Sequence, residues 1–431
     1  MKYFRYIPYL LLVFMPLLIG RAVAETNTPT AITSIWANAQ PLTTVSNSPN
    51  GAQRPVVAEA PNGDLIVVYL KQQSSNQLDT DPFYRRSYDG GTNWTIPLRI
   101  YTSAASSRQV DVAFDNQNRA HAVWTEADNQ LWYAREDAWV GNSAKQLFSA
   151  TVGVVVIDSP KLAVDSNGIL HLVWFQFDIN GTDIYYSRST NGGANWTSPE
   201  NVSNSLGSSE SPALVIDDSN RVHLVWDEQV GGSVYQINYS LRNTTGVWTT
   251  PVAVSTVAPS ITSAKEPDIF VNGSRVMVAF EDRAGLNEQY LYYLECTTNC
   301  TASPATSTNW ISTQATTQAY TAKDTDPTYL GHKVIPVGSC RQIFFSGIDG
   351  PATSNNEKVR LANSCDGFTS NPIIGTINAS LGSNDRAIKP SVLSINNWIV
   401  YIAYERKGLT RSDIYLVKGV PVIYLPTITK N

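Results

Sequence analysis

Short apolar runs recur along the chain and are separated by Asn, Asp and Gly residues. The runs are rich in Val, Ile, Tyr and Trp, and such runs bounded by turn residues predict β-strands. The clearest group spans residues 159–199 and includes the runs 171–174 and 184–188. Residues 211–251 repeat this group, and residues 110–135 repeat its first part. A repeat of about 50 residues that holds four short strands is typical of a β-propeller blade.

In most repeats, the first strand is expected to start at a dipeptide whose second residue is Pro. We therefore expect an all-β fold, a β-propeller of four-stranded antiparallel blades. Seven blades are favoured, and six remain the alternative because the later repeats are less regular. The seven expected starts are Arg54-Pro55, Gln109-Val110, Ser159-Pro160, Ser211-Pro212, Glu266-Pro267, Asp326-Pro327 and Lys389-Pro390.

The two ends of the repeat array complement each other. The last repeat stops after its third strand, at residues 413–417, whereas residues 36–46 resemble the fourth strand of a repeat. Pairing these segments would complete the last blade and remove an exposed sheet edge. We expect one propeller domain over residues 25–419, closed by this N-terminal strand, with residues 420–431 as a tail outside the pattern.

The first 24 residues have the pattern of an export signal. Lys2 and Arg5 precede the apolar run 9–19, and Ala22-Val23-Ala24 offers a small-residue cleavage site. We expect a signal peptide, with a retained anchor as the alternative. No later stretch is long and apolar enough to cross a bilayer. The prediction is a secreted or cell-surface protein without stable membrane insertion.

Charge limits the classes of partner. The whole chain carries a net charge of −5, and cleavage of the signal would remove Lys2, Arg5 and Arg21 and make the chain more acidic. An acidic chain does not favour nucleic acid, which requires a basic face. Only 16% of the residues are charged and 10% are aromatic, as in an all-β extracellular protein. We expect a monomer without a cofactor.

The four cysteines fit an oxidising compartment. Of the three possible connectivities, Cys296–Cys300 with Cys340–Cys365 requires the least chain movement. A zinc site is the alternative, but no histidine lies at ligand spacing.

Two turns share a specific pattern, Ser-x-Asp-x-Gly-x-x-Trp, at residues 87–94 and, with Asn for Asp, at residues 189–196. The Asp or Asn side chain accepts backbone N–H bonds, and Gly allows positive φ. Weaker copies occur at residues 240–248 and 364–368. The expected structural residues are Ser87, Asp89, Gly91, Trp94, Ser189, Asn191, Gly193 and Trp196.

These turns resemble the Asp-box, or BNR, repeats of the sialidase superfamily. The first repeat extends the resemblance, because Arg54-Pro55 is similar to an Arg-Ile-Pro motif and residues 85–87 are similar to the Arg-Arg-Ser before the first Asp box. The resemblance implies a propeller in which Arg54 binds a carboxylate and Asp79 or Asp81 is the acid/base. Arg54 departs from the motif because it touches Pro55 directly.

A sialidase also needs further arginines on the sugar carboxylate and a Tyr nucleophile activated by Glu. The candidates are Arg283, Arg341 and Arg406 for the first role, Tyr404 or Tyr401 for the nucleophile, and Glu228 or Glu266 for its partner. Tyr401 and Tyr404 also lie within an apolar strand, which is the pattern of core residues.

Charged residues gather where first strands start and second strands end, which is one face of an antiparallel blade. We expect a charged rim around the central channel that binds extracellular glycans or a protein partner; the alternative is a retaining exo-α-sialidase. His121, His171 and His223, with Trp124, Trp174 and Trp226, occupy repeated positions and are expected to pack blades rather than bind metal. The expected rim residues are Arg108, Glu126, Asp158, Glu210, Glu228, Glu266, Asp282, Asp326 and Glu405.

Overall fold

The computed structural model describes residues 35–36, 40–42, 51–73, 79–103, 105–149, 156–179, 181–257, 261–285, 288–302, 309–316, 332–337, 340–348, 357–369, 372–377, 386–395, 399–407 and 412–420. The predicted signal peptide, Asp326 and most of the tail lie outside these residues.

Seven antiparallel sheets make up the described chain. Apart from them there are only a short helix, α1 (Glu136–Trp139), and a 3-10 turn, η1 (Ser255–Val257), within these residues. Blade by blade, the strands are β3 (Ala52–Glu59), β4 (Leu65–Gln72), β5 (Thr80–Ser87) and β6 (Leu98–Arg99); β7 (Ser107–Phe114), β8 (Ala120–Glu126), β9 (Gln130–Arg135) and β10 (Lys145–Ser149); β11 (Val156–Val164), β12 (Leu170–Asp178), β13 (Gly181–Ser189) and β14 (Glu200–Asn201); β15 (Ser209–Ile216), β16 (Val222–Gly231), β17 (Val234–Arg242) and β18 (Val252–Ala253); β19 (Ala264–Asn272), β20 (Arg275–Gly285), β21 (Glu288–Cys296) and β22 (Trp310–Gln314); β23 (Lys333–Val337), β24 (Cys340–Gly347), β25 (Lys358–Ser364) and β26 (Ile373–Thr376); and β27 (Arg386–Ile395), β28 (Ile399–Lys407) and β29 (Ser412–Val420).

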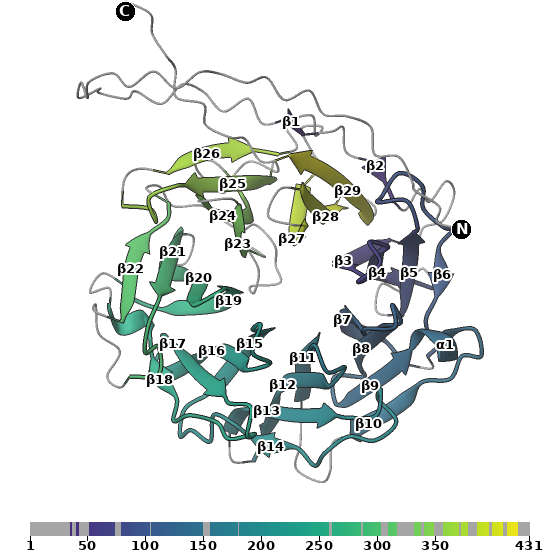
Figure 1. Cartoon of the computed structure of the whole chain (residues 1–431), viewed down its shortest axis with the longest axis horizontal. Helices are drawn as coiled ribbons and strands as arrows, with labels where there is room; N and C mark the ends of the chain where they lie inside the picture. The colour runs from purple at the N-terminus through teal and green to yellow at the C-terminus, as the bar shows by residue number, and fades with distance from the viewer. Residues whose placement is uncertain are drawn as a thin grey trace, which may run out of the picture. The chain divides into compact units, whose positions relative to one another are not determined.

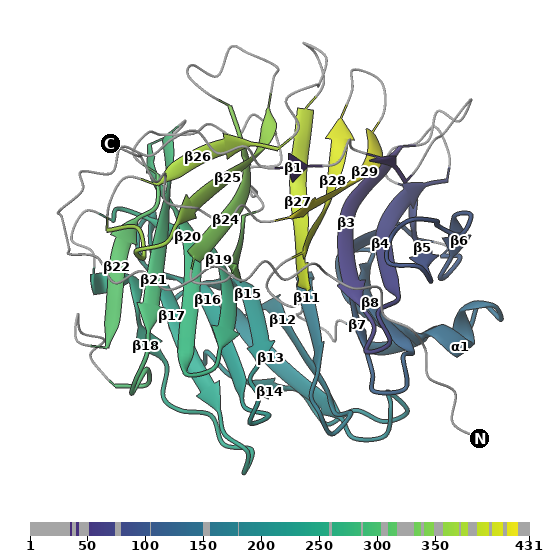
Figure 2. The same ribbon diagram turned by 45° about the horizontal axis from the view of Figure 1, so that its top comes forward.

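The first strands of the blades form the inner wall of a ring. Each contacts the first strand of the next blade, in the order β3, β7, β11, β15, β19, β23 and β27, and β27 contacts β3 again. Figures 1 and 2 show this arrangement, with each sheet extending outward from its first strand. The all-β, seven-bladed prediction is confirmed, and the six-bladed alternative is wrong.

Two short N-terminal strands lie against the last blade. β1 (Ile35–Trp36) and β2 (Gln40–Pro41) both pair with β29. Leu42 follows β2, is buried, and donates its N–H to the Ile414 carbonyl over 2.9 Å. The idea that this segment is what holds the ring closed stays a prediction.

The expectation that X-Pro dipeptides start the first strands is wrong for the described dipeptides. The five that the structure describes lie inside their strands at a β-bulge, where two residues face one residue of the second strand: Arg54-Pro55, Ser159-Pro160, Ser211-Pro212, Glu266-Pro267 and Lys389-Pro390. Asp326-Pro327 lies outside the described residues. Pro has no N–H to offer the ladder, and a bulge accommodates it. The residue at the bulge has positive φ, between 36° and 56°, in Arg54, Gln109, Ser159, Ser211, Glu266 and Lys389.

The repeated His and Trp residues pack the blades, as the repeat predicted. Trp124, Trp174 and Trp226 are fully buried between sheets. The Nδ1 of His171 hydrogen-bonds the Tyr186 hydroxyl over 2.8 Å, and its Nε2 lies 3.5 Å from Asp165. His121 and His223 repeat this arrangement. Burial lowers the pKa of all three imidazoles, to about 4 for His171.

The two Asp-box turns form the same hydrogen bonds. Asn93 donates its N–H to Asp89 over 2.8 Å, and the Trp94 indole donates to the Gly91 carbonyl over 3.1 Å. Residues 189–196 reproduce both contacts. A Cβ at Gly91 would lie 3.0 Å from the Tyr401 ring of the last blade, so the glycine allows the blades to approach.

The two weaker copies of this turn differ. Phe368 takes the place of the glycine with φ of 64°, and its N–H bonds the Ser364 hydroxyl over 2.7 Å. The Ser240 hydroxyl instead donates to the Thr249 carbonyl, as Ser187 does to Thr197. The copy at residues 240–248 is therefore not an Asp-box turn, because its serine occupies the position of Ser187 rather than of Ser189.

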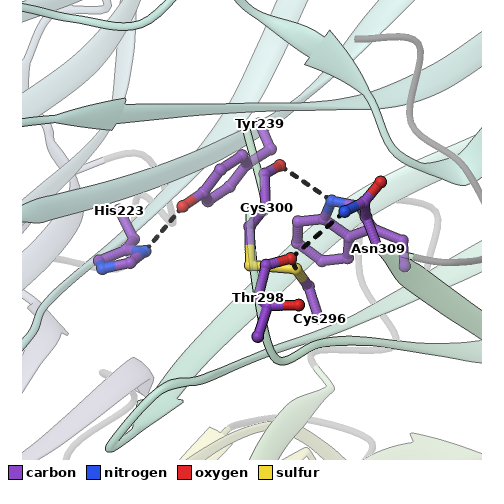
Figure 3. The surroundings of a disulfide bond; sticks show 7 residues. His223, Tyr239, Cys296, Thr298, Cys300 and Asn309 are labelled. Carbon is purple, nitrogen blue, oxygen red and sulfur yellow. Dashed lines mark hydrogen bonds between the residues drawn. A yellow bond between two sulfur atoms is a disulfide. The ribbon is translucent and has the colours of Figure 1, made fainter. Parts of the chain in front are cut away.

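The predicted disulfides, Cys296–Cys300 and Cys340–Cys365, are both formed. Figure 3 shows the first one, where Asn309 donates to the Thr298 carbonyl over 3.4 Å. The Trp310 indole donates to the Cys300 carbonyl over 3.0 Å and meets the ring of Tyr239 from the preceding blade at 5.3 Å. The small loop thus braces the contact between two blades.

Candidate functional site

The strand register defines two faces of the propeller. First strands begin beside the ends of second strands and the starts of third strands, as in the pairs Ala52–Lys71 and Lys71–Asp81. We call this end the mouth face. The Asp-box turns follow the third strands and lie at the opposite end.

A central cavity of about 370 Å³ is lined by the first strands of the blades. The bulge residues Arg54, Gln109, Ser211, Glu266 and Lys389 all line it. Charged and polar side chains therefore surround this cavity at the level of the bulges.

Deeper in the channel, some polar side chains join neighbouring blades. Asp111 accepts the Leu162 N–H over 2.8 Å, and Asp268 accepts the Val334 N–H over 2.9 Å and binds Lys333 over 2.6 Å. Ser391 accepts the Val57 N–H over 3.0 Å in the same way. These polar side chains therefore stabilise the contacts between neighbouring blades.

Three carboxylates converge on the mouth face between the fourth and fifth blades. Arg283 Nη2 lies 2.5 Å from Glu281 and 3.7 Å from Glu266. Asp227 of the neighbouring blade accepts the Glu266 backbone N–H over 3.0 Å. Asp227 and Glu281 are fully buried, and within the described residues each keeps one carboxylate oxygen without a hydrogen bond.

Three further residues complete the group. Lys265 lies 3.6 Å from Glu210, and its ammonium is 3.5 Å from the centre of the Tyr235 ring. The Glu210 side chain is 34% exposed, against 9% for Glu266, so Glu210 and Tyr235 form the accessible edge. We call these seven residues the mouth cluster: Glu210, Asp227, Tyr235, Lys265, Glu266, Glu281 and Arg283.

Burial and mutual repulsion dominate the electrostatics of the mouth cluster. Desolvation, reinforced by Asp227 and Glu281, raises the pKa of Glu266 well above its usual value. Desolvation likewise raises the pKa of Asp227 and of Glu281, although Arg283 opposes the shift in Glu281. Glu266 is the carboxyl group of this cluster most inclined to keep a proton, and a protonated carboxyl can donate a hydrogen bond to a ligand.

The predicted acid/base residues, Asp79 and Asp81, lie in the first blade and do not belong to the mouth cluster. Asp81 accepts the Ser103 N–H over 3.0 Å, and Glu126 accepts the Ser103 hydroxyl over 2.5 Å. Asp183, at the equivalent position of the third blade, accepts the Ser205 N–H over 3.1 Å. Asp81 therefore anchors a loop in the same way as its repeat counterpart.

Asp79 lies beside this anchor at the start of the third strand. Within the described residues its side chain forms no hydrogen bond or ion pair. Its charge is one of the smaller contributions to the raised pKa of Asp81, which desolvation dominates.

The four candidate arginines have four different surroundings. Arg54 faces the central cavity and interacts electrostatically with Asp158. Arg283 belongs to the mouth cluster, and Arg406 donates to the Tyr415 hydroxyl over 2.8 Å. Arg341, at the start of a second strand, binds Glu295 on the opposite face over 3.0 Å. Arg341 therefore does not converge with Arg54 and Arg283.

The candidate nucleophiles are core residues in the structure. Tyr404 is 1% exposed and stacks on Tyr415 between the sixth and seventh blades. Tyr401 is buried and donates its hydroxyl to the Gly90 carbonyl over 2.7 Å. Both side chains are shielded from solvent.

The remaining rim residues are spread around the ring. Arg108 pairs with Asp128 over 2.8 Å, and Asp282 anchors Thr262 and Ser263 through three hydrogen bonds. Asp158 accepts the Ser159 N–H over 2.5 Å, and burial raises its pKa. Glu405 is buried at the end of β28. Asp326 lies outside the described residues.

Sequence reasoning missed Tyr235 in this cluster. Tyr235 lies in β17, which forms a hairpin with β16. The strand β16 extends to Gly231 and is among the longest of the second strands. The length of this hairpin was the available signal, because a long hairpin at a strand end projects side chains over the face.

No family model matches this chain, and no curated protein matches it in sequence. Solved structures do match. A protein of unknown function from Dyadobacter fermentans is 14% identical with a TM-score of 0.54, over 90% of this chain and 99% of that one. An ulvan lyase, described as a new polysaccharide lyase family, is 12% identical with a TM-score of 0.58, over 85% and 94%. These matches show the fold alone, a β-propeller similar to that of the ulvan lyase.

A Trypanosoma rangeli sialidase is similar over 90% of this chain and 59% of its own, with 10% identity and a TM-score of 0.48, which is too distant to bear on function. None of the helices in the described part of the chain has the length and hydrophobicity of a bilayer span. Among the same residues, no three His, Cys, Asp or Glu side chains are grouped to hold a metal ion.

Proposed function

We propose that the protein binds an extracellular glycan at the mouth cluster. The observation that carries the proposal is the meeting of four carboxyl groups, a guanidinium, an ammonium and a tyrosine ring at one point beside the central cavity. Sugar hydroxyls both donate and accept hydrogen bonds, and an aromatic face packs on the apolar face of a sugar ring. Tyr235 and Glu210 form the side open to such a ligand.

Two further observations support the proposal. The ulvan lyase of similar fold was solved with the acidic saccharide -[GlcA(1-4)Rha3S]-, so this architecture can carry a polysaccharide ligand. The two disulfides fit an oxidising, extracytoplasmic compartment, which is where polysaccharides are met.

The test is binding of the purified protein to ulvan, alginate, pectin, chondroitin sulfate, xylan and a sialylated glycoprotein, measured by affinity electrophoresis and calorimetry. In Glu210→Gln we expect affinity for the bound polysaccharide to fall by about tenfold, the value of a charged hydrogen bond. Asp218→Asn is the matched control, because Asp218 is exposed in the same blade on the opposite face. No binding to any of these polysaccharides, or equal affinity in both variants, would contradict the proposal.

A further inference from the structure

An open groove of about 1100 Å³ lies between the third and fourth blades. One wall is the loop of residues 202–207, and the other is the hairpin of β16 and β17. Glu228, Gln236 and Asn238 line it between the walls, with Trp248 at its outer part. Glu228 is one of the expected rim residues, but the mouth cluster does not include it.

The loop wall is held in place by several contacts. Asp183 accepts the Ser205 N–H over 3.1 Å, and the Gln229 N–H donates to the Ser208 carbonyl over 2.8 Å. A Cβ at Gly207 would lie 2.0 Å from the Gln229 carbonyl oxygen, so the loop lies directly on β16. The groove is therefore preformed, and a ligand pays little ordering entropy to enter it.

Planar polar side chains form the floor of the groove. Asn238 donates to Glu228 Oε2 over 2.6 Å, and Gln236 donates to Asn238 Oδ1 over 3.1 Å. The Trp226 indole also donates to Glu228 Oε2, over 3.1 Å. These are the hydrogen bonds of the Glu228 and Gln236 side chains within the described residues. Glu228 Oε1 and Gln236 Oε1 therefore keep their capacity to accept hydrogen bonds from hydroxyl groups.

Apolar side chains flank this polar floor. Leu206 on the loop wall is fully exposed, and Val230 on the hairpin is 53% exposed. A polar floor between apolar edges suits a sugar chain, whose rings have apolar faces and hydroxyl-bearing edges. A protein partner would instead favour aromatic and Arg anchors in an apolar pocket.

The groove and the mouth cluster lie on the two sides of the fourth blade. Glu228 follows Asp227 in β16, so the two side chains lie on opposite faces of the same sheet. The Ser208 hydroxyl, at the end of the loop wall, donates to Glu210 Oε1 over 3.0 Å, and Glu210 pairs with Lys265. A ligand that crosses the top of the fourth blade would thus contact both places.

We infer that the protein binds a linear polysaccharide at two places. One segment of the polysaccharide occupies the mouth cluster, and the groove binds additional sugar residues of the same chain. The inference rests on the proposed function and deepens it, because it makes the ligand an extended chain rather than a single terminal sugar. Glu228 and Gln236 are the residues that recognise this second segment.

The experiment compares disaccharide and long fragments, prepared by partial hydrolysis of the polysaccharide that binds most tightly in the panel above. Long fragments should bind wild type more tightly than the disaccharide. Gln236→Ala should weaken binding of long fragments by roughly three- to tenfold and leave the disaccharide unchanged. Asp218→Asn again serves as control, and circular dichroism checks that each variant is folded.

Two results would overturn this inference without contradicting the proposed function. One is affinity that does not depend on fragment length, and the other is a Gln236→Ala protein that binds long fragments as wild type does, while Glu210→Gln still weakens both fragment sizes. If instead no polysaccharide of the panel binds, the proposed function and the groove both fail.

Discussion

At the scale of single residues, the mouth cluster concentrates buried charge. Glu266 and Glu281 both contact Arg283, but only Glu281 does so closely, at 2.5 Å. Burial raises the pKa of Glu266 well above its normal value. An acid whose pKa is higher in the folded state stabilises the fold least at high pH, because ionisation then opposes folding. Burial also raises the pKa of Glu281, but its close contact with Arg283 opposes that shift, so the two glutamates should respond differently to the same substitution.

Glu266→Gln is expected to raise the melting temperature at pH 8 by about 1 °C or more, since it removes a carboxyl group that resists ionisation. The gain should shrink as the pH falls through the raised pKa towards the unfolded value near 4.5.

Glu281→Gln should instead destabilise the protein, by about 3 kcal/mol, because it leaves Arg283 without its close partner. Thermal unfolding at several pH values measures both, and equal responses would refute this account.

His171 gives a second residue-level prediction. Its pKa falls from 6.5 to about 4 on folding, mainly through burial. A depressed pKa contributes stability above the unfolded pKa, and this contribution is lost as the pH drops towards the folded pKa. The stability advantage of wild type over His171→Gln should therefore shrink between pH 6.5 and about 4, in paired urea unfolding curves. An advantage that stays constant over this window would show that His171 is not buried in its neutral form.

At the scale of the elements, the repeat made the blades predictable. The His and Trp positions and the Asp-box turns recur in several repeats, so strand order and blade number followed from the sequence. The bulges did not, because Pro at a strand start and Pro at a bulge have the same sequence pattern. The mouth cluster could be predicted only in part. Charge at strand ends marked Glu210, Glu266 and Arg283, but their meeting depends on contacts between blades that no local pattern records.

The N-terminal strand is the element whose role can be tested most simply. Leu42 is 2% exposed and packs with core residues of the first and last blades. If this segment closes the ring, Leu42→Ala should cost about 2–4 kcal/mol of unfolding free energy. Ile96→Ala, at a side chain that is 73% exposed, is the control. Equal stability of the two variants in chemical denaturation would mean that the segment does not hold the ring closed.

At the scale of the whole molecule, the candidate residues that a sialidase would need together lie apart. Arg341 lies on the face opposite Arg54 and Arg283, and Tyr404 lies in the core. We therefore expect no hydrolysis of a fluorogenic sialoside by the purified protein. Turnover that disappears in Arg54→Ala would restore the sialidase hypothesis and place the reaction at the first blade.

The measurement that tests the central claim most directly is a crystal structure of the protein soaked with fragments of the polysaccharide that it binds. The account predicts a sugar in contact with Glu210, Tyr235 and Glu266 at the mouth face, between the fourth and fifth blades. Sugar density on the Asp-box face, or at the first blade beside Asp81 with the mouth cluster empty, would contradict it.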